Sequence, residues 1–104
     1  MNDRNRKILE FAGFWKMTWS NGNFQWHTPN DKPCDPPEID LNFLAEEVFP
    51  RLQEQGFQID IVLFEQSGCN VAIFNVIRSE SDIHEGKDND LLEACLQAVE
   101  QAIK

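Results

Sequence analysis

The sequence predicts an α+β fold, in which a mainly antiparallel sheet of about four strands carries packed helices as an α-β-α layered sandwich. Apolar residues recur at helical spacing from Asp40 to about Gln55, and again after residue 90. Between them, two apolar runs at 57–64 and 71–77 are joined by a short loop containing Gly68, which is typical of an antiparallel hairpin. Parts of both runs are apolar on both faces, so we expect helices above and below the sheet.

A chain of 104 residues, of which 41% are apolar, suits one folded domain. We expect three parts within it: an N-terminal helix and hairpin over 1–27, a proline-rich loop over 28–39, and a helix–hairpin–helix core over 40–104. The loop holds four of the five prolines. Because proline lacks the backbone N–H, we expect no regular element there.

A short helix is predicted at the start of the chain. Asn2 or Asp3 would cap a helix over 3–12, because a side-chain oxygen there can accept a hydrogen bond from the first turn. Gly13 would end it, since glycine readily adopts the left-handed conformation that follows many helices.

An aromatic hairpin is predicted next. Asn21-Gly22 separates two aromatic-rich runs, and both residues tolerate the positive φ that a type I′ turn requires. Alternation along the first run places Trp15, Met17 and Trp19 on one side.

The central helix contains a conflict. Asp40 would cap it, its apolar spacing runs from Leu41 to Leu52, and Gly56 would end it. Pro50 lies inside this pattern and removes one backbone hydrogen bond, at a cost of about 3 kcal/mol. Because the apolar spacing continues past Pro50, we expect a kink and not a break.

The last part of the chain predicts an acidic loop and a helix. Segment 79–90 contains five acids against Lys87 alone. Asp88 or Asn89 would cap the closing helix, and the negative charge before it favours a helix N-terminus. The apolar stripe of this helix consists of Leu92, Cys95, Leu96, Val99, Ala102 and Ile103.

The cysteines and the hydropathy indicate a compartment. Cys34, Cys69 and Cys95 are an odd number with no C-x-x-C pair, which favours a reducing environment. No apolar run approaches the roughly 18 residues that cross a bilayer. The basic start is not followed by the apolar stretch of a secretory signal. We therefore expect a cytoplasmic protein without a membrane partner.

The charge of the chain excludes some partners. Its net charge is −9, from 18 acidic and 9 basic residues. Residues 1–17 hold four bases against two acids, so the excess of acids lies in the rest of the chain. Such a surface repels phosphates, and we expect no direct nucleic-acid binding. It suits solubility, a basic partner protein, or mimicry of nucleic acid.

No constellation of reactive side chains stands out. The cysteines, His27 and His84 lack the short ligand spacings of structural zinc sites, and the acids around Gly86 do not fit a calcium loop. Cys69, in a predicted turn, could act as a nucleophile only if one of the histidines reached it. We expect no catalytic residue, no metal and no cofactor, and hence a protein that is not an enzyme.

Two groups of residues are candidates for binding a partner. The aromatic group either covers a sheet face as core or forms an exposed patch, because tryptophan is enriched at binding hot spots. Its candidate residues are Trp15, Trp19 and Trp26. The acidic group either keeps the protein soluble or imitates phosphates and so blocks a nucleic-acid-binding protein. Its candidate residues are Glu80, Asp82 and Glu85.

Three short motifs are Ala12-Gly13-Phe14-Trp15, the Trp-x-Thr-Pro of residues 26–29 and the Pro-x-x-Asp-Leu-Asn of residues 37–42. These motifs resemble those of small uncharacterised bacteriophage and prophage proteins. The strand after Gly56, the strand beginning at Val71 and the closing helix from Leu91 to Ala98 are similar to the phage ABA sandwich domain. The resemblance implies an α-β-α layered fold, and it implies no activity and no catalytic residue.

On these grounds we expect a non-enzymatic, phage-like interaction protein that binds a host protein, with basic nucleic-acid-binding proteins among the candidate partners. A homodimer through the aromatic hairpin is a further expectation. The alternative is an acidic nucleic-acid mimic with an anti-defence role, which inhibits a bacterial defence enzyme or another nucleic-acid enzyme. Both functions require a surface and no reaction chemistry.

Overall fold

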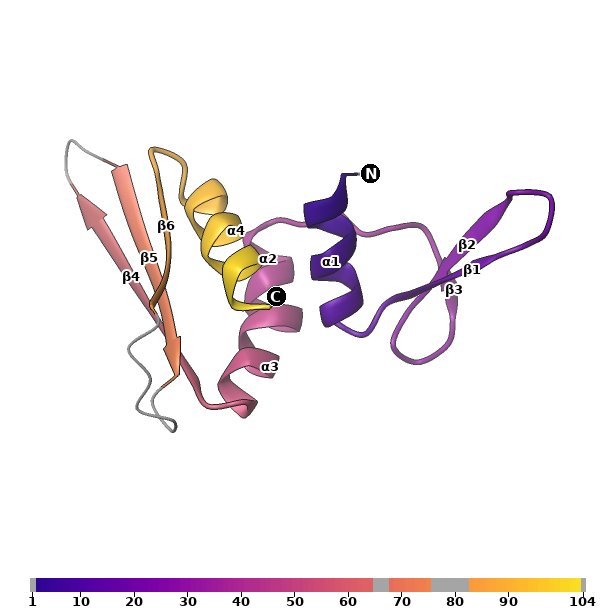
Figure 1. Cartoon of the computed structure of the whole chain (residues 1–104), viewed down its shortest axis with the longest axis horizontal. Helices are drawn as coiled ribbons and strands as arrows, with labels where there is room; N and C mark the ends of the chain where they lie inside the picture. The colour runs from indigo at the N-terminus through magenta and orange to yellow at the C-terminus, as the bar shows by residue number, and fades with distance from the viewer. Residues whose placement is uncertain (1, 65–67, 76–82, 104) are drawn as a thin grey trace.

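The computed structural model describes residues 2–64, 68–75 and 83–103. Within them the chain forms helices and two three-stranded antiparallel sheets, sheet A with the order β1-β2-β3 and sheet B with the order β4-β5-β6 (Figure 1). The α+β class is confirmed. The expected sheet of about four strands is instead divided in two, because each predicted hairpin pairs with a third strand of its own.

Helix α1 (Asp3–Phe11) begins where the sequence predicts and ends one residue before the predicted Ala12, which is its C-cap. The Asn2 side chain caps it by accepting a hydrogen bond from the Asn5 backbone N–H, at 2.8 Å. Gly13 follows with a φ of 94°, which allows the chain to turn sharply away from the helix. The helix buries Ile8 and Leu9, and it packs against the last helix of the chain.

Strands β1 (Trp15–Thr18) and β2 (Phe24–His27) form the predicted aromatic hairpin, but the turn between them differs from the expected type I′. The register pairs Thr18 with Phe24, and the Trp19 N–H donates to the Asn23 carbonyl oxygen at 2.8 Å. A three-residue loop therefore remains, in which Gly22 alone has a positive φ, of 89°. The residue before it keeps a negative φ because a three-residue loop needs the left-handed conformation only at its last position.

Strand β3 (Pro33–Cys34) corrects the prediction that segment 28–39 contains no regular element. It pairs with the end of β2, matching Cys34 to Trp26 and Pro33 to His27. Proline is tolerated as the first residue of an edge strand, where no ladder hydrogen bond is lost. A strand of two residues is too short to give an alternating pattern, so the sequence contained no signal for it.

The central helix runs through Pro50, as predicted, and its disturbance is a π-helical turn. It consists of α2 (Leu41–Phe43), a π turn over Leu44–Val48 and α3 (Phe49–Glu54). Asp40 caps it by accepting from the Phe43 N–H at 2.8 Å. The Phe49 N–H bonds to the carbonyl of Leu44, five residues earlier, directly before the proline that cannot donate.

Sheet B contains one strand that the sequence did not reveal. β4 (Phe57–Phe64) has the predicted bounds, and β5 (Gly68–Asn75) begins three residues before the predicted Val71. The predicted end of that run, Ile77, lies outside the described residues. β6 (Ile83–Asp88) lies within the segment expected to be an acidic loop. It is an edge strand whose buried position is a glycine, Gly86, so its sequence shows no apolar alternation.

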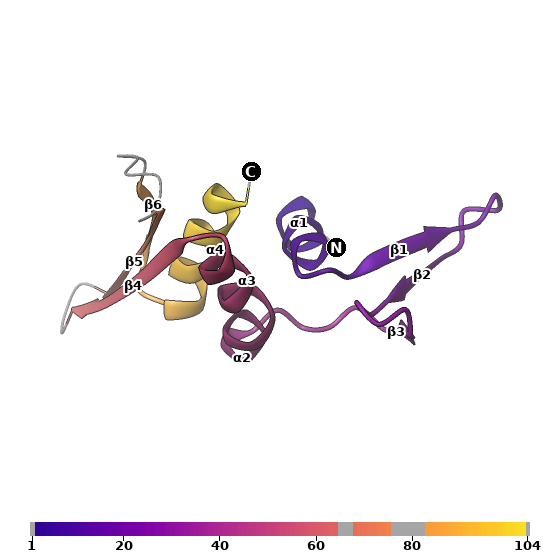
Figure 2. The ribbon, with the colours of Figure 1, turned by 90° about the horizontal axis from the view of Figure 1, so that it is seen from below.

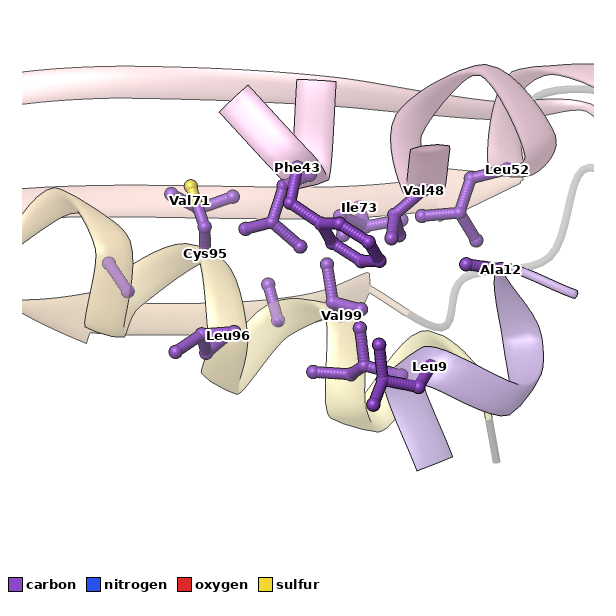
Figure 3. Close-up of a cluster of buried hydrophobic side chains, with 14 of the residues drawn as sticks. Leu9, Ala12, Phe43, Val48, Leu52, Val71, Ile73, Cys95, Leu96 and Val99 are labelled. Atoms are coloured by element: carbon purple, nitrogen blue, oxygen red, sulfur yellow. The ribbon is translucent and has the colours of Figure 1, made fainter. Parts of the chain in front are cut away.

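Helix α4 (Leu91–Ala102) covers sheet B and closes the core. Its cap is Asp90, which accepts from the Leu92 N–H at 3.3 Å, one or two residues after the predicted Asp88 or Asn89. The predicted stripe is confirmed over its middle, where Cys95, Leu96 and Val99 are buried. Figure 3 shows these side chains meeting residues from α1, from the central helix and from β5, among them Leu9, Leu52, Val71 and Ile73.

The helices lie on one side of sheet B, which corrects the expectation of helices above and below it (Figures 1 and 2). Val71 and Ile73 face α4 and are fully buried, whereas no described element covers the opposite face. The second half of β4 is apolar on both faces and was expected to lie between two helix layers, but it is exposed.

The described chain is elongated. Its principal extents are 48 × 32 × 20 Å, and its radius of gyration is 15.2 Å. A compact domain of this length would have a radius of gyration of about 13 Å. The difference arises because the β1–β2 hairpin projects from α1 as an arm, away from the helices and sheet B (Figures 1 and 2).

Candidate functional site

The pleat of the β1–β2 hairpin gives the arm two faces of different composition. Residues paired across the two strands share a face. One face carries Trp15 with its partner His27, and Met17 with Gln25. The other face carries Lys16 with Trp26, and Thr18 with Phe24.

Trp15 and Trp19 are exposed. Trp15 has 36% of its surface accessible, Trp19 has 50%, and Met17 is also exposed. The Trp15 ring stacks on the His27 ring, with 4.1 Å between centroids and 7° between planes. Its Nε1 donates to an Asp31 carboxylate oxygen at 3.1 Å. The stack and the hydrogen bond hold the Trp15 ring in one orientation. The side chain therefore loses little conformational entropy when a partner binds.

Trp26 lies on the opposite face and has the opposite role. It is only 3% exposed and belongs to the main hydrophobic cluster. The two interpretations of the aromatic group therefore apply to different residues. Trp26 belongs to the core, whereas Trp15 and Trp19 are exposed. Together with Met17 they form a surface that we call the aromatic face.

A cationic, largely apolar pocket lies beside Trp26, and sequence reasoning missed it. Its volume is about 380 Å³, and its lining residues are Arg6, Lys16, Phe24, Trp26 and Pro36. Lys16 Nζ lies 5.0 Å from the Phe24 ring centroid and 6.0 Å from that of Trp26, within cation–π range. The three-residue loop pairs Lys16 with Trp26. A prediction of this loop from the sequence would therefore have placed the cation beside the buried ring and indicated the pocket.

The two cations of this pocket differ in their partners. Arg6 contacts Asp3 at 3.0 Å and Glu10 at 3.3 Å on its own helix. Lys16 has no carboxylate partner among the described residues. The ammonium group of Lys16 is therefore the one that could meet a carboxylate of a binding partner, next to an apolar wall.

The predicted acidic site is only partly visible. Glu80 and Asp82 lie outside the described residues. Glu85 lies in β6, where its carboxylate is 3.8 Å from Lys87 Nζ, and this neighbour reduces its negative potential. Because Glu85 belongs to sheet B and the tryptophans belong to the arm, Glu85 and the tryptophans do not form one site (Figure 1). The nucleic-acid-mimic alternative stays a prediction.

The cysteines occupy positions that favour packing over reactivity. Cys69 lies in strand β5 opposite Asp88, not in a turn, and it packs half-buried against the core. Cys95 is buried in α4, and burial raises the pKa of its thiol to about 11, which keeps it protonated at neutral pH. Among the described residues, no group of three or more histidines, cysteines or acids could hold a metal ion.

In comparisons with known proteins, no family model matched the chain, and neither a curated protein nor a solved structure matched it. The site must therefore be interpreted from its own geometry. None of the helices in the described ranges is long and apolar enough to cross a membrane.

Proposed function

We propose that this protein is a non-enzymatic binding module that recognises another protein through the aromatic face of its arm. One observation carries the proposal: two tryptophans and a methionine are exposed on a hairpin that projects from the body. Tryptophan is the residue type most enriched at interface hot spots. Folding uses Trp26 for the core and leaves Trp15 and Trp19 free to contact a partner.

The chemistry of the arm favours a partner that combines an apolar surface with a carboxylate. The aromatic face offers flat rings with few rotamers, which suits apolar side chains. On the reverse face, Lys16 lies over Phe24 without a carboxylate partner among the described residues. A partner that wraps around the tip of the arm would contact both faces.

The proposed setting follows from the sequence. The motifs that resemble phage and prophage proteins make a bacterial host protein the expected class of partner. The free thiols of Cys34 and Cys69 are consistent with a reducing cytoplasm. The partner's identity is the first unknown that an experiment should resolve.

The test is an affinity capture from bacterial lysate with the full chain, compared with its Trp19→Ala variant, and followed by titration of any purified partner. Trp19 is exposed, so its truncation should leave the fold intact while it removes a hot spot. We expect the dissociation constant to rise by about 30-fold, corresponding to roughly 2 kcal/mol.

Phe64→Ala is the matched control, because Phe64 is also an aromatic residue with 50% exposure but lies in sheet B. Binding that survives the Phe64 change and is lost with the Trp19 change supports the arm. Binding that ignores Trp19 and falls steeply with salt would instead favour the acidic surface. Failure of Trp15→Ala and Trp19→Ala together to weaken any interaction would refute the proposal.

A further inference from the structure

β4 is an edge strand of sheet B, and one of its two edges is free of any described strand. β4 has eight residues and pairs with β5 along one side only. Among the described residues, no strand pairs with its other side. A long apolar edge strand presents unpaired N–H and C=O groups, which can template pairing with another strand.

The opposite edge of the same sheet is already closed by helix α4. Gln101 accepts a hydrogen bond from the Glu85 N–H at 3.3 Å and donates its amide to the Glu85 carbonyl at 2.9 Å. Gln97 accepts from the Lys87 N–H at 3.1 Å. Two glutamine side chains thus occupy the edge of β6, and no described residue makes such a contact at the edge of β4.

These glutamine contacts also fix which backbone groups of β4 point outward. Successive residues of a strand direct their N–H and C=O groups to alternate sides. Since Glu85 directs its groups away from β5, its pairing partner Ala72 directs its own groups toward β4, where Ala72 pairs with Asp60. Asp60 is therefore engaged within the sheet, and its neighbours Ile59 and Ile61 direct their groups to the open edge. Leu63 follows by the same alternation.

The side chains along this edge are exposed as well. Leu63 is 66% exposed and Phe64 is 50% exposed, and Ile61 and Val62 before them are also exposed. Four consecutive exposed apolar residues are unusual in a folded protein unless the segment binds something. The first half of β4 differs, because Phe57 and Ile59 pack against the core beside α3.

We propose that a second copy of this chain covers this edge, with the two β4 strands antiparallel and Ile61 facing Ile61 of the second copy across a two-fold axis. Ile59 of each copy then faces Leu63 of the other, and each such pair exchanges two hydrogen bonds through the outward groups. The two-fold axis places the helix-covered first half of each strand beside the exposed second half of the other. Ile61 and Leu63, which share a face with Val71 and Ile73, thereby lie beside the helix layer of the other copy, whereas Val62 and Phe64 lie on the opposite face.

The charge of β4 permits self-pairing and excludes one alternative register. Asp60 is the single charged residue of β4, although the chain as a whole carries −9. A register that set Asp60 opposite Asp60 of the second copy would place like charges face to face, which is destabilising. Centring the pair on Ile61 sets Asp60 opposite Val62 instead. The strand therefore meets its own copy without local repulsion.

The area available fits a reversible dimer. Each copy contributes the free halves of four large apolar side chains together with the strand backbone. In a symmetric pair this amounts to on the order of 1,000 Å², at the lower end of specific interfaces. We therefore expect a monomer–dimer equilibrium that depends on concentration. This inference is independent of the proposed function of the arm, because it uses sheet B alone.

The first experiment is sedimentation velocity on the full chain over a wide range of concentration, with two isoleucine-to-proline variants. Ile61→Pro removes an outward N–H and leaves the β4–β5 hydrogen bonds in place, so the dimer should be lost. Ile83→Pro is the matched control, because Ile83 is an exposed isoleucine on the other edge strand and its N–H also points away from β5. The control should dimerise like the unchanged protein, and circular dichroism should show both variants folded.

A cysteine pair tests the register and does not depend on the proline variants folding. In a Cys34→Ser, Cys69→Ser background, Ile61→Cys should form a disulfide-linked dimer on mild oxidation, because facing Cα atoms lie within about 7 Å. Ile59→Cys should not, since it faces Leu63 of the second copy. A chain that stays monomeric at every concentration, or a dimer that survives Ile61→Pro, overturns the proposal. Cross-linking through Ile59→Cys overturns the register.

Discussion

The two three-stranded sheets have the same antiparallel order, but different forces stabilise them. Sheet B has strands of eight, eight and six residues, and Val71 and Ile73 are fully buried beneath α4. Sheet A has strands of four, four and two residues, and Trp26 is its one fully covered residue. The rest of sheet A is held by a ring stack and by polar contacts such as Gln25 to the Cys34 carbonyl, at 2.8 Å.

This difference indicates where binding surface is available. In sheet B the apolar residues of the central strand stabilise the fold, so changing them should cause unfolding. In sheet A, Trp26 is the tryptophan that is buried in the core, and Trp15 and Trp19 remain accessible. The arm is therefore the part of the molecule whose surface can be altered without loss of the core, which makes the proposed binding role testable.

The largest predicted loss of stability is that of Gly86→Ala in sheet B. A Cβ at this position would overlap the Ala94 carbonyl oxygen and lie 2.9 Å from the Ala98 nitrogen, both in the backbone of α4. Neither atom can move without displacing the helix. We expect a loss of more than about 3 kcal/mol, sufficient to unfold most of the protein. Urea denaturation followed by far-UV circular dichroism measures it, and a variant of near-normal stability would contradict the close approach of α4 to β6.

Trp26→Ala tests whether the arm can unfold alone. Removing a buried tryptophan costs about 3–5 kcal/mol where the cavity cannot collapse. We expect rapid hydrogen exchange throughout β1, β2 and β3, while the amides of β5 and α4 remain protected. Mass-spectrometric hydrogen exchange reads both regions in one sample. Equal loss of protection in both sheets would show that arm and body fold as one unit.

Gly22→Ala applies a smaller change to the arm. No atom lies within 4 Å of a Cβ added there, so space is not limiting, but the φ of 89° is unfavourable for alanine. We expect a cost of about 1 kcal/mol that is confined to the hairpin. Near-UV circular dichroism of the tryptophans and thermal unfolding measure it. Gly22→Asn should cost less, because asparagine tolerates the left-handed region better.

The smallest predicted loss of stability is that of Glu93→Gln, which removes a charge from the contact between α1 and α4. Arg4 donates to both carboxylate oxygens of Glu93, at 2.7 Å and 3.1 Å. The Arg4 hydrogen bond lowers the pKa of Glu93 below its ordinary value of 4.5. Both side chains are partly exposed, so we expect a loss of about 0.5–1 kcal/mol at pH 7.

The pH dependence of this effect has a definite sign. A lowered carboxyl pKa in the folded state means that the stabilisation is fully present above pH 4.5 and is lost as the pH falls through the lowered pKa. The stability difference between the unchanged protein and Glu93→Gln should therefore shrink at acidic pH and at high salt. A difference that is constant across both series would mean that the ion pair contributes nothing through its charge.

The elements that could be predicted from the sequence are those with clear capping residues or strong apolar periodicity. Asn2, Gly13 and Asp40 fixed helix ends through their caps, and the alternation from Phe57 gave β4 its bounds. β3 and β6 were missed for physical reasons. Two residues cannot show a period, and β6 meets α4 through Gly86, a close backbone contact that leaves no apolar side chain in the pattern.

The candidate site was predicted by residue type but not by face. Trp15 and Trp26 cannot be told apart by composition, since both flank the same turn in aromatic runs. Their faces depend on a register set by the three-residue loop at Gly22. A change of one residue in that register would move every side chain of the strand to the other face. The pocket at Lys16 was missed for the same reason.

The contact between α1 and α4 constrains when this protein can complete its fold. Arg4 and Glu93 are 89 residues apart, and α4 follows every other described element along the chain. During synthesis, α1 is made before α4, so Leu9 has its main covering helix only after α4 has emerged from the ribosome. The apolar side of α1 therefore lacks this cover while every element between α1 and α4 is synthesised, when chaperones and unwanted partners have most access to it.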